Sequence, residues 1–116
     1  MKPRIYHNPR CSKSRATMAL LESRGIDAEI IEYLKTPPDA GTLAGLLEKL
    51  GIPARDLVRK GEKAFKSAGV DLEAASDSSV IELMTTHPVL IQRPIVETAE
   101  AARIGRPPEQ VLELFS

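Results

Sequence analysis

The sequence contains no tryptophan, few aromatic residues, a single cysteine and no excess of either charge. Its 116 residues include two Tyr and two Phe, so we expect no aromatic surface for stacking bases and no nucleic-acid partner. Sixteen basic and sixteen acidic side chains cancel, which leaves no overall field to attract a nucleic acid or an anionic membrane. Any electrostatic function must therefore be local.

Long apolar runs are also missing. No stretch approaches the roughly 18 apolar residues of a membrane span, and residues 1–5 lead into a predicted strand without the apolar segment of a signal peptide. A lone cysteine cannot form an intramolecular disulfide, which fits a reducing compartment. We therefore expect a cytoplasmic protein without membrane association, in which any disulfide involves another molecule.

The length and the 42% of hydrophobic residues are typical of one domain, which we expect to span residues 1–116. The pattern of apolar and turn residues predicts strands at residues 4–7, 28–33, 90–96 and 101–104, and helices at 12–24, 43–50, 77–87 and 108–115, with two short helices between 53 and 68. Asp77 is the expected N-cap of the helix at 77–87. The first strand, helix and strand form a unit that normally places its two strands parallel.

This order predicts an α/β protein with a mixed four-stranded sheet and a helical insertion. Its only cysteine, Cys11, lies where the first strand passes into the first helix, an arrangement typical of the thioredoxin-like (glutaredoxin-like) fold. A helix N-terminus offers unpaired N–H groups and a partial positive charge, and both favour a thiolate over a thiol. We therefore place the reactive centre of the protein at this junction.

Cys11 is surrounded by polar and basic residues. Arg10, Lys13 and Arg15 contribute three cations, so we expect a thiol pKa below the usual value of about 8.5. The alternative is a buried, inert cysteine that behaves as a small hydrophobic residue, but its neighbours are not apolar. The sequence therefore predicts that Cys11 is a nucleophile.

Ser14 stands where a dithiol redox motif would have its second cysteine. Cys11 can hold a covalent adduct but cannot resolve it as an internal disulfide, so an external thiol must complete each cycle. The Ser14 hydroxyl is placed either to donate a hydrogen bond to the thiolate or to cap the helix. A tyrosine-phosphatase loop is excluded, because it needs five residues between its Cys and Arg and only three separate Cys11 from Arg15.

Further short segments carry signatures that are weak alone and specific together. They are residues 5–9 followed by Cys11, Ser14 and Arg15, then residues 33–38, 87–88, 93–96 and 106–107. In this order they resemble the glutaredoxin-linked arsenate reductases (the ArsC family), small cytoplasmic proteins of thioredoxin-like fold, over almost the whole chain. The resemblance implies reduction of arsenate to arsenite, with glutathione as co-substrate, glutaredoxin as partner, and no metal or bound organic cofactor.

The resemblance also implies roles for individual residues. Cys11 is the nucleophile, and Arg59, Arg93 and Arg106 surround the oxyanion. His7 matches a family histidine near the cysteine, and the remaining supporting residues are Ser14, Arg15 and Pro94. Planar, forked guanidinium groups suit a tetrahedral oxyanion, which would neutralise their clustered charge.

The alternative for each arginine is a solvated surface charge. This alternative is weakest for Arg93, which precedes Pro94 between apolar strand residues, and strongest for Arg59, which lies in a charged segment. His7 has the comparable alternative of an ordinary histidine on the first strand. The bond between Arg93 and Pro94 is a candidate cis peptide, since cis bonds are nearly confined to proline.

The best-known active-site loop of that family resembles Cys-Gly-Thr-Ser-Arg, whereas this chain reads Cys-Ser-Lys-Ser-Arg with Arg10 before it. We expect the added positive charge to favour an anionic thiol such as glutathione, or an oxyanion other than arsenate. Two other functions stay open. One is a general monothiol oxidoreductase without arsenate selectivity. The other is a regulator that resembles the Spx proteins and binds RNA polymerase, although those proteins typically carry a Cys-x-x-Cys switch that Ser14 interrupts.

Overall fold

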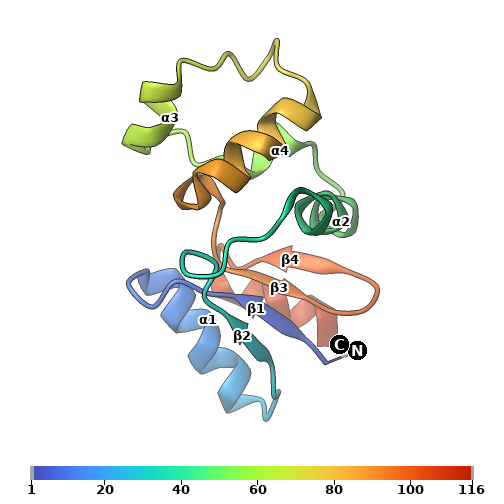
Figure 1. The fold of residues 1–116 in the computed structure, drawn as a ribbon. Coiled ribbons are helices and arrows are strands. Elements are labelled where there is room, and N and C mark those ends of the chain that lie inside the picture. The colour runs from blue at the N-terminus through green and yellow to red at the C-terminus, as the bar shows by residue number, and fades with distance from the viewer. Residues whose placement is uncertain (1, 116) are drawn as a thin grey trace. The chain divides into compact units, whose positions relative to one another are not determined.

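A mixed four-stranded sheet joins the two ends of the chain in the computed structural model, which describes residues 2–115 (Figure 1). The contacts divide the chain into two compact units. We call residues 1–36 with 93–116 the sheet unit, and residues 37–92 the helical unit. The helical unit is thus an insertion in the sequence of the sheet unit, as the element order predicted.

The sheet has the strand order β2-β1-β3-β4, with β1 at Arg4–Tyr6, β2 at Glu29–Ile31, β3 at Ile95–Glu97 and β4 at Ala102–Ile104. Strand β1 is parallel to β2 and antiparallel to β3, and β3 is antiparallel to β4. The crossover between the parallel strands is helix α1, Ser12–Ser23. This arrangement confirms the mixed four-stranded sheet expected from the sequence.

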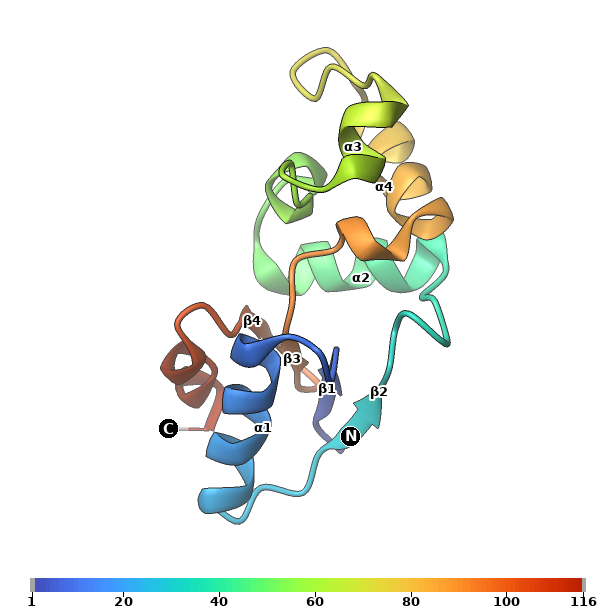
Figure 2. The ribbon, with the colours of Figure 1, turned by 90° about the vertical axis from the view of Figure 1, so that its left-hand side faces the viewer.

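Helix α1 and the 3-10 helix η3, Pro108–Phe115, pack against each other beside the sheet (Figure 2). Successive side chains of a strand point to opposite faces of the sheet. Ile5 of β1 and its register partner Val96 of β3 both point to this helical layer. The core that results is fully apolar. Its buried members are Ile5, Leu21, Val96 and Val111.

Three strand residues on the opposite face, Arg4, Tyr6 and Glu97, form a polar cluster. The Tyr6 hydroxyl donates a hydrogen bond to Oε1 of Glu97 at 3.2 Å, and Nη1 of Arg4 lies 3.7 Å from the same oxygen. Tyr6 and Glu97 are both buried. Burial, together with the negative charge and the hydrogen bond of Glu97, raises the pKa of Tyr6 to about 12. The carboxylate is thereby paired on two sides, as a buried charge requires.

The helical unit consists of short helices linked by tight turns. They are α2 at Ala40–Leu50, η1 at Ala54–Leu57, α3 at Lys63–Ala68, α4 at Asp77–Thr86 and η2 at Pro88–Leu90. Helix α4 packs against α2, η1 and η2. Asp39 caps α2 by accepting from the N–H of Thr42 at 2.7 Å, and Gly51 ends it with φ +71°. Among residues 2–115, no helix combines the length and the apolar character needed to cross a bilayer.

Three local predictions differ from the structure. The N-cap of α4 is Ser76, whose Oγ accepts from the N–H of Ser79 at 3.2 Å, and Asp77 is the first helical residue. Leu90 ends a 3-10 turn that Pro88 begins, because proline at the first helical position favours a turn over a strand. Only Ile91 pairs, in an isolated bridge with Val58. The last helix, at 108–115, is 3-10 throughout.

We predict that the Tyr6 hydroxyl makes stability depend on alkaline pH. The folded protein holds the phenolic proton more tightly than the unfolded chain, so its stabilising contribution is complete below pH 10.0 and is lost as the pH rises through about 12. In urea unfolding, the free-energy difference between the wild type and Tyr6→Phe is expected to be constant up to about pH 9 and then to move against the wild type. A difference that stays constant to pH 12 would contradict the buried hydrogen bond to Glu97.

Candidate active site

The loop between β1 and α1 contains a turn with Pro9 at its second position, and this turn places Cys11 at the start of α1. The carbonyl of Asn8 accepts from the N–H of Cys11 at 3.0 Å, with Pro9 at the second turn position, where its fixed φ is favourable. Oδ1 of Asn8 also accepts from the N–H of Arg10 at 3.0 Å. Nη1 of Arg15 donates to the carbonyl of Pro9 at 2.9 Å and ties the helix back to the loop. The turn is therefore held at several points.

Cys11 occupies the N-cap position of α1, with φ −93° and ψ 123°. Its sulfur replaces the oxygen of a Ser or Asp cap and faces the backbone N–H groups of Ser14 and Lys13. The first turn of α1 contains no acidic residue, so its partial positive charge is not neutralised within the helix. The position itself thus favours a negatively charged sulfur.

Two arginines approach the sulfur from the other side. The register that pairs Ile95 with Ile104 also brings the residues just before β3 and just after β4 to the same end of the sheet. Nη2 of Arg106 donates to Sγ of Cys11 at 3.6 Å, while its Nε donates to the carbonyl of Arg93 at 2.8 Å. The Arg93 guanidinium interacts with both Cys11 and the hydroxyl of Tyr33.

The protonation states follow from these neighbours. Burial raises the pKa of the Cys11 thiol, but the N–H groups of Ser14 and Lys13 and the Arg93 guanidinium outweigh it and hold the pKa below its ordinary value. Burial likewise opposes the charge of Arg93, but Tyr33 and Cys11 more than offset this and raise its pKa. The site therefore favours a thiolate beside charged guanidinium groups.

The Ser14 hydroxyl has partners other than the thiol. Its Oγ lies 2.6 Å from Nδ1 of His7 and accepts from the N–H of Asn8 at 3.0 Å. The side chain of Ser14 thus connects His7 to the loop, whereas its backbone N–H faces the sulfur. Burial lowers the pKa of His7, and Arg15 acts in the same direction while Glu32 opposes it. His7 is therefore a neutral neighbour of the site near pH 7.

A sequence model described as the ArsC family matches residues 6–114. The chain belongs to the ArsC family. The match confirms the family that the ordered motifs indicated, and it includes all residues of the site just described.

Related proteins resemble this ArsC-family chain over nearly their full length. A protein of Escherichia coli strain K12 named "Uncharacterized protein YfgD" is 49% identical over 112 residues, with 96% of this chain and 94% of that protein covered. The arsenate reductase of Neisseria meningitidis serogroup A is 43% identical over 109 residues, covering 93% of each. The solved structure of an arsenate reductase from Vibrio cholerae superposes with a TM-score of 0.93 at 46% identity and covers 97% of each chain.

The two prolines that follow the site arginines have cis peptide bonds, Arg93-Pro94 and Arg106-Pro107. The sequence pointed to Pro94 and not to Pro107. Pro94 is buried, and its carbonyl accepts from the N–H of Gly105 at 2.9 Å. Pro94 therefore connects the segments that carry the two arginines.

Arg59 belongs to the helical unit, unlike the other candidate residues of this ArsC-family chain. Its backbone N–H donates to the carbonyl of Leu90 at 2.7 Å, and its Nε donates to Oε1 of Glu62 at 3.3 Å. The carboxylate neutralises part of its charge. A role of Arg59 in binding the oxyanion stays a prediction.

Three contributors to the site were not predicted. Tyr33 was noted only as part of a motif, and nothing in the sequence links it to Arg93. The turn role of Asn8 has a local signal, since Asn before Pro is a common turn start. Gly105 has no local signal, because its neighbours Thr17 and Pro94 are distant in the sequence.

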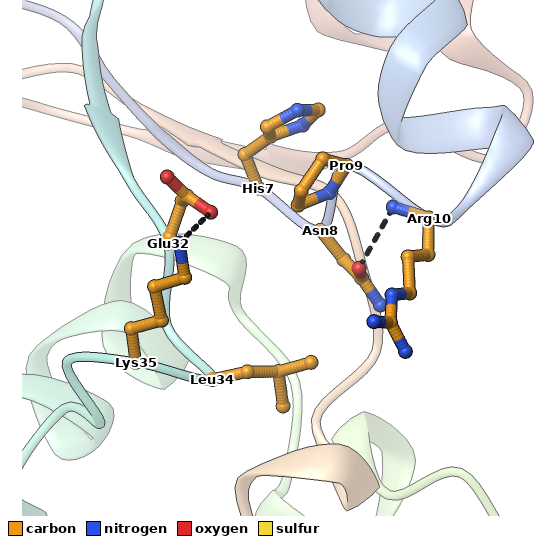
Figure 3. A pocket seen from close by; sticks show the side chains of 7 residues that line it. All are labelled: His7, Asn8, Pro9, Arg10, Glu32, Leu34 and Lys35. Carbon is orange, nitrogen blue, oxygen red and sulfur yellow. Dashed lines mark hydrogen bonds and ion pairs between the residues drawn. The ribbon is translucent and has the colours of Figure 1, made fainter.

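A pocket of about 210 Å³ lies beside the loop between β1 and α1. His7, Pro9 and Arg10 of this loop and the segment that follows β2 line it (Figure 3). That segment contributes Leu34 and an ion pair between Lys35 and Glu32, with 3.5 Å between Nζ and Oε1. The pocket thus offers charges of both signs. Within residues 2–115, no group of three or more His, Cys, Asp or Glu side chains could hold a metal ion.

We predict that Cys11 reacts as a thiolate below the range of an ordinary thiol. Alkylation by iodoacetamide at pH 6 should be faster than that of free cysteine, because the Arg93 guanidinium and the helix N–H groups stabilise the negative sulfur. Arg93→Ala should shift the midpoint of the pH profile upward, and Arg24→Ala, an exposed change at the C-terminal end of α1, should not. A wild-type midpoint at or above about 8.5 would contradict the assignment.

Proposed function

We propose that this chain is an arsenate reductase that uses Cys11 as its nucleophile and glutathione with glutaredoxin as its reductant. The observation that carries the proposal is the approach of two guanidinium groups to one sulfur, with Nη2 of Arg106 at 3.6 Å from Sγ and the Arg93 guanidinium interacting with the same sulfur. The names of relatives at 43% and 46% identity support arsenate as the substrate.

The reaction begins with attack of the Cys11 thiolate on the arsenic of arsenate. A sulfur–arsenic bond forms, one arsenate oxygen leaves with two protons as water, and the negative charge passes from sulfur to the remaining oxyanion. Arg93 and Arg106 remain beside both groups and stabilise the charge as it develops. We include Arg59 as a third cation on the strength of the family resemblance.

Glutathione completes the reduction, because the chain has no second cysteine. Its sulfur bonds to the sulfur of Cys11, the sulfur–arsenic bond breaks, and the electron pair stays on arsenic, which leaves as arsenite. The two sulfurs are oxidised to a mixed disulfide, which a glutaredoxin thiol then reduces. Glutathione carries two carboxylates and one ammonium group, and the pocket beside the loop offers Arg10, Lys35 and Glu32 as complementary charges.

The cell compartment and the domain organisation are parts of the same proposal. A thiolate that must be regenerated by glutathione operates in a reducing compartment, and we place the protein in the cytoplasm. We also treat residues 1–116 as one functional domain, because a single family model matches residues 6–114.

The direct test is production of arsenite by the purified protein with glutathione and glutaredoxin. We expect turnover in the wild type and none with Cys11→Ser, since a serine hydroxyl ionises at far higher pH than a thiol. Circular dichroism should show that the serine variant remains folded. Intact-mass analysis of the wild type after a single turnover without glutaredoxin should show one glutathione per chain, and addition of glutaredoxin should remove it.

Two results would overturn this function. One is substantial arsenite production by Cys11→Ser. The other is equal turnover with thioredoxin and no glutathione, which would make the protein a general monothiol oxidoreductase.

We also predict that oxyanion binding depends on the forked shape of the Arg93 and Arg106 guanidinium groups and not on their charge alone. Arg93→Lys and Arg106→Lys keep the charge but lose the forked donor, so each should weaken oxyanion binding by around 1 to 3 kcal/mol, seen as a higher KM for arsenate. Arg55→Lys, at an exposed position of η1, is the matched control and should leave KM unchanged. Equal effects at all three positions would mean that no specific arginine clamp exists. Arg59→Lys in the same assay decides whether the third arginine participates.

A further inference from the structure

Residue 105 must be a glycine because neighbouring atoms leave no room for a Cβ, and not because its backbone needs a positive φ. The glycines that need a positive φ in the described chain are Gly25, Gly51 and Gly69. A Cβ on Gly105 would lie 2.6 Å from Oγ1 of Thr17 and 2.8 Å from Cγ of Pro94, distances that real Cβ atoms essentially never show. We call Arg93-Pro94, just before β3, the β3 entry, and Gly105-Arg106, just after β4, the β4 exit. Helix α1 and these two segments therefore approach each other at a point where no side chain fits.

The same point holds the two arginines in register. Gly105 directly precedes Arg106, and Pro94 directly follows Arg93. The N–H of Gly105 donates to the carbonyl of Pro94 at 2.9 Å, and Nε of Arg106 donates to the carbonyl of Arg93 at 2.8 Å. A displacement at Gly105 is therefore passed to Arg106 through one peptide and to Arg93 through these hydrogen bonds.

Thr17 connects this point to the other half of the site. It is fully buried, and its Oγ1 donates to the carbonyl of Lys13 at 2.9 Å. Lys13 lies in the first turn of α1, whose N–H groups face the sulfur of Cys11. The contact of Thr17 with Gly105 thus fixes the distance between the first turn of α1 and the two arginines, Arg93 and Arg106.

We propose that Gly105 is a positioning residue that sets the distance between the Cys11 sulfur and the guanidinium groups of Arg93 and Arg106. The proposal rests on the function proposed above for its arsenate readout only. A side chain at residue 105 would separate α1 from the β4 exit and lengthen the 3.6 Å contact between Nη2 of Arg106 and Sγ of Cys11. The lack of a Cβ is then a requirement of the chemistry as well as of packing.

Gly105→Ala is the primary test, with the pH profile of iodoacetamide alkylation as its first readout. We expect the rate at pH 6 to fall about tenfold, the effect of a rise of one unit in the thiol pKa. In the arsenite assay we expect KM for arsenate to rise about tenfold, the loss of one charge-assisted hydrogen bond. The alkylation readout needs no arsenate, so a wild type that makes no arsenite would overturn the proposed function and leave this test intact.

Val111→Ala separates positioning from simple loss of stability. Val111 is fully buried in the core between α1, η3 and the sheet, so its truncation lowers Tm without adding atoms near the sulfur. We expect a lower Tm with a wild-type alkylation profile. If Val111→Ala shifted the profile as much as Gly105→Ala, the effect would be one of stability and the positioning role would be wrong.

A compensating change at Thr17 provides the second variant. Thr17→Ala removes the atom nearest to the added Cβ, and the contact with Pro94 stays. The double variant Thr17→Ala with Gly105→Ala is therefore expected to fold and to show a midpoint between those of the wild type and the single Gly105 variant. If Gly105→Ala alone does not fold, the double variant decides. A wild-type midpoint in Gly105→Ala, or in the double variant where only the double variant folds, would overturn the proposal.

Discussion

The arrangement of donors in the sheet unit matches the needs of one negative charge on the Cys11 sulfur. Such a charge is stable near neutral pH only where donors surround it, and here they come from separate parts of the chain. The first turn of α1 supplies backbone N–H groups, and the β3 entry and the β4 exit supply guanidinium groups. The parallel and antiparallel pairings of β1 bring these segments to one end of the sheet.

The same donors serve two successive anions in the proposed reaction. In the resting site they stabilise the thiolate, and after attack they face an oxyanion that carries the charge which left the sulfur. Groups already oriented toward developing charge need no rearrangement during the step, which is the main source of electrostatic catalysis. The raised pKa of Arg93 means that its guanidinium stays charged in both stages. The hydrogen bond from Arg106 to the carbonyl of Arg93 keeps the pair oriented while the anion changes.

The sequence predicted those features that depend on neighbours close in the chain. Cys11 at a helix start, Gly51 at a helix end and the parallel pairing of β1 with β2 all follow from local signals. The predicted N-cap of α4, Asp77, was wrong by one residue, because Ser76 beside it is an equally good N-cap residue. The partners of the Ser14 hydroxyl were also missed. A hydroxyl can bond to any polar group in reach, and tertiary contacts decided for His7 and Asn8.

The candidate residues came from two sources, and the structure bears on them differently. Physical reasoning predicted a lowered pKa for Cys11 from the helix start and from the charges of Arg10, Lys13 and Arg15. The pKa is lowered, and its causes are the N–H groups of Ser14 and Lys13 and the guanidinium of Arg93. Family motifs supplied Arg93 and Arg106, which the structure brings to the sulfur. Arg59 came from the family resemblance and from none of the quoted motifs, and it has a carboxylate partner, Glu62, in the helical unit. The steric demand at Gly105 was out of reach, since Thr17 and Pro94 meet it only after folding.

The insertion of the helical unit into the sheet unit also affects synthesis of the protein. Cys11 precedes residues 37–92 in the chain, whereas Arg93 and Arg106 follow them. During synthesis the sulfur therefore exists before its guanidinium partners. At that stage only the first turn of α1 can lower the pKa of the thiol. The full set of donors comes together only when β3 and β4 join the sheet.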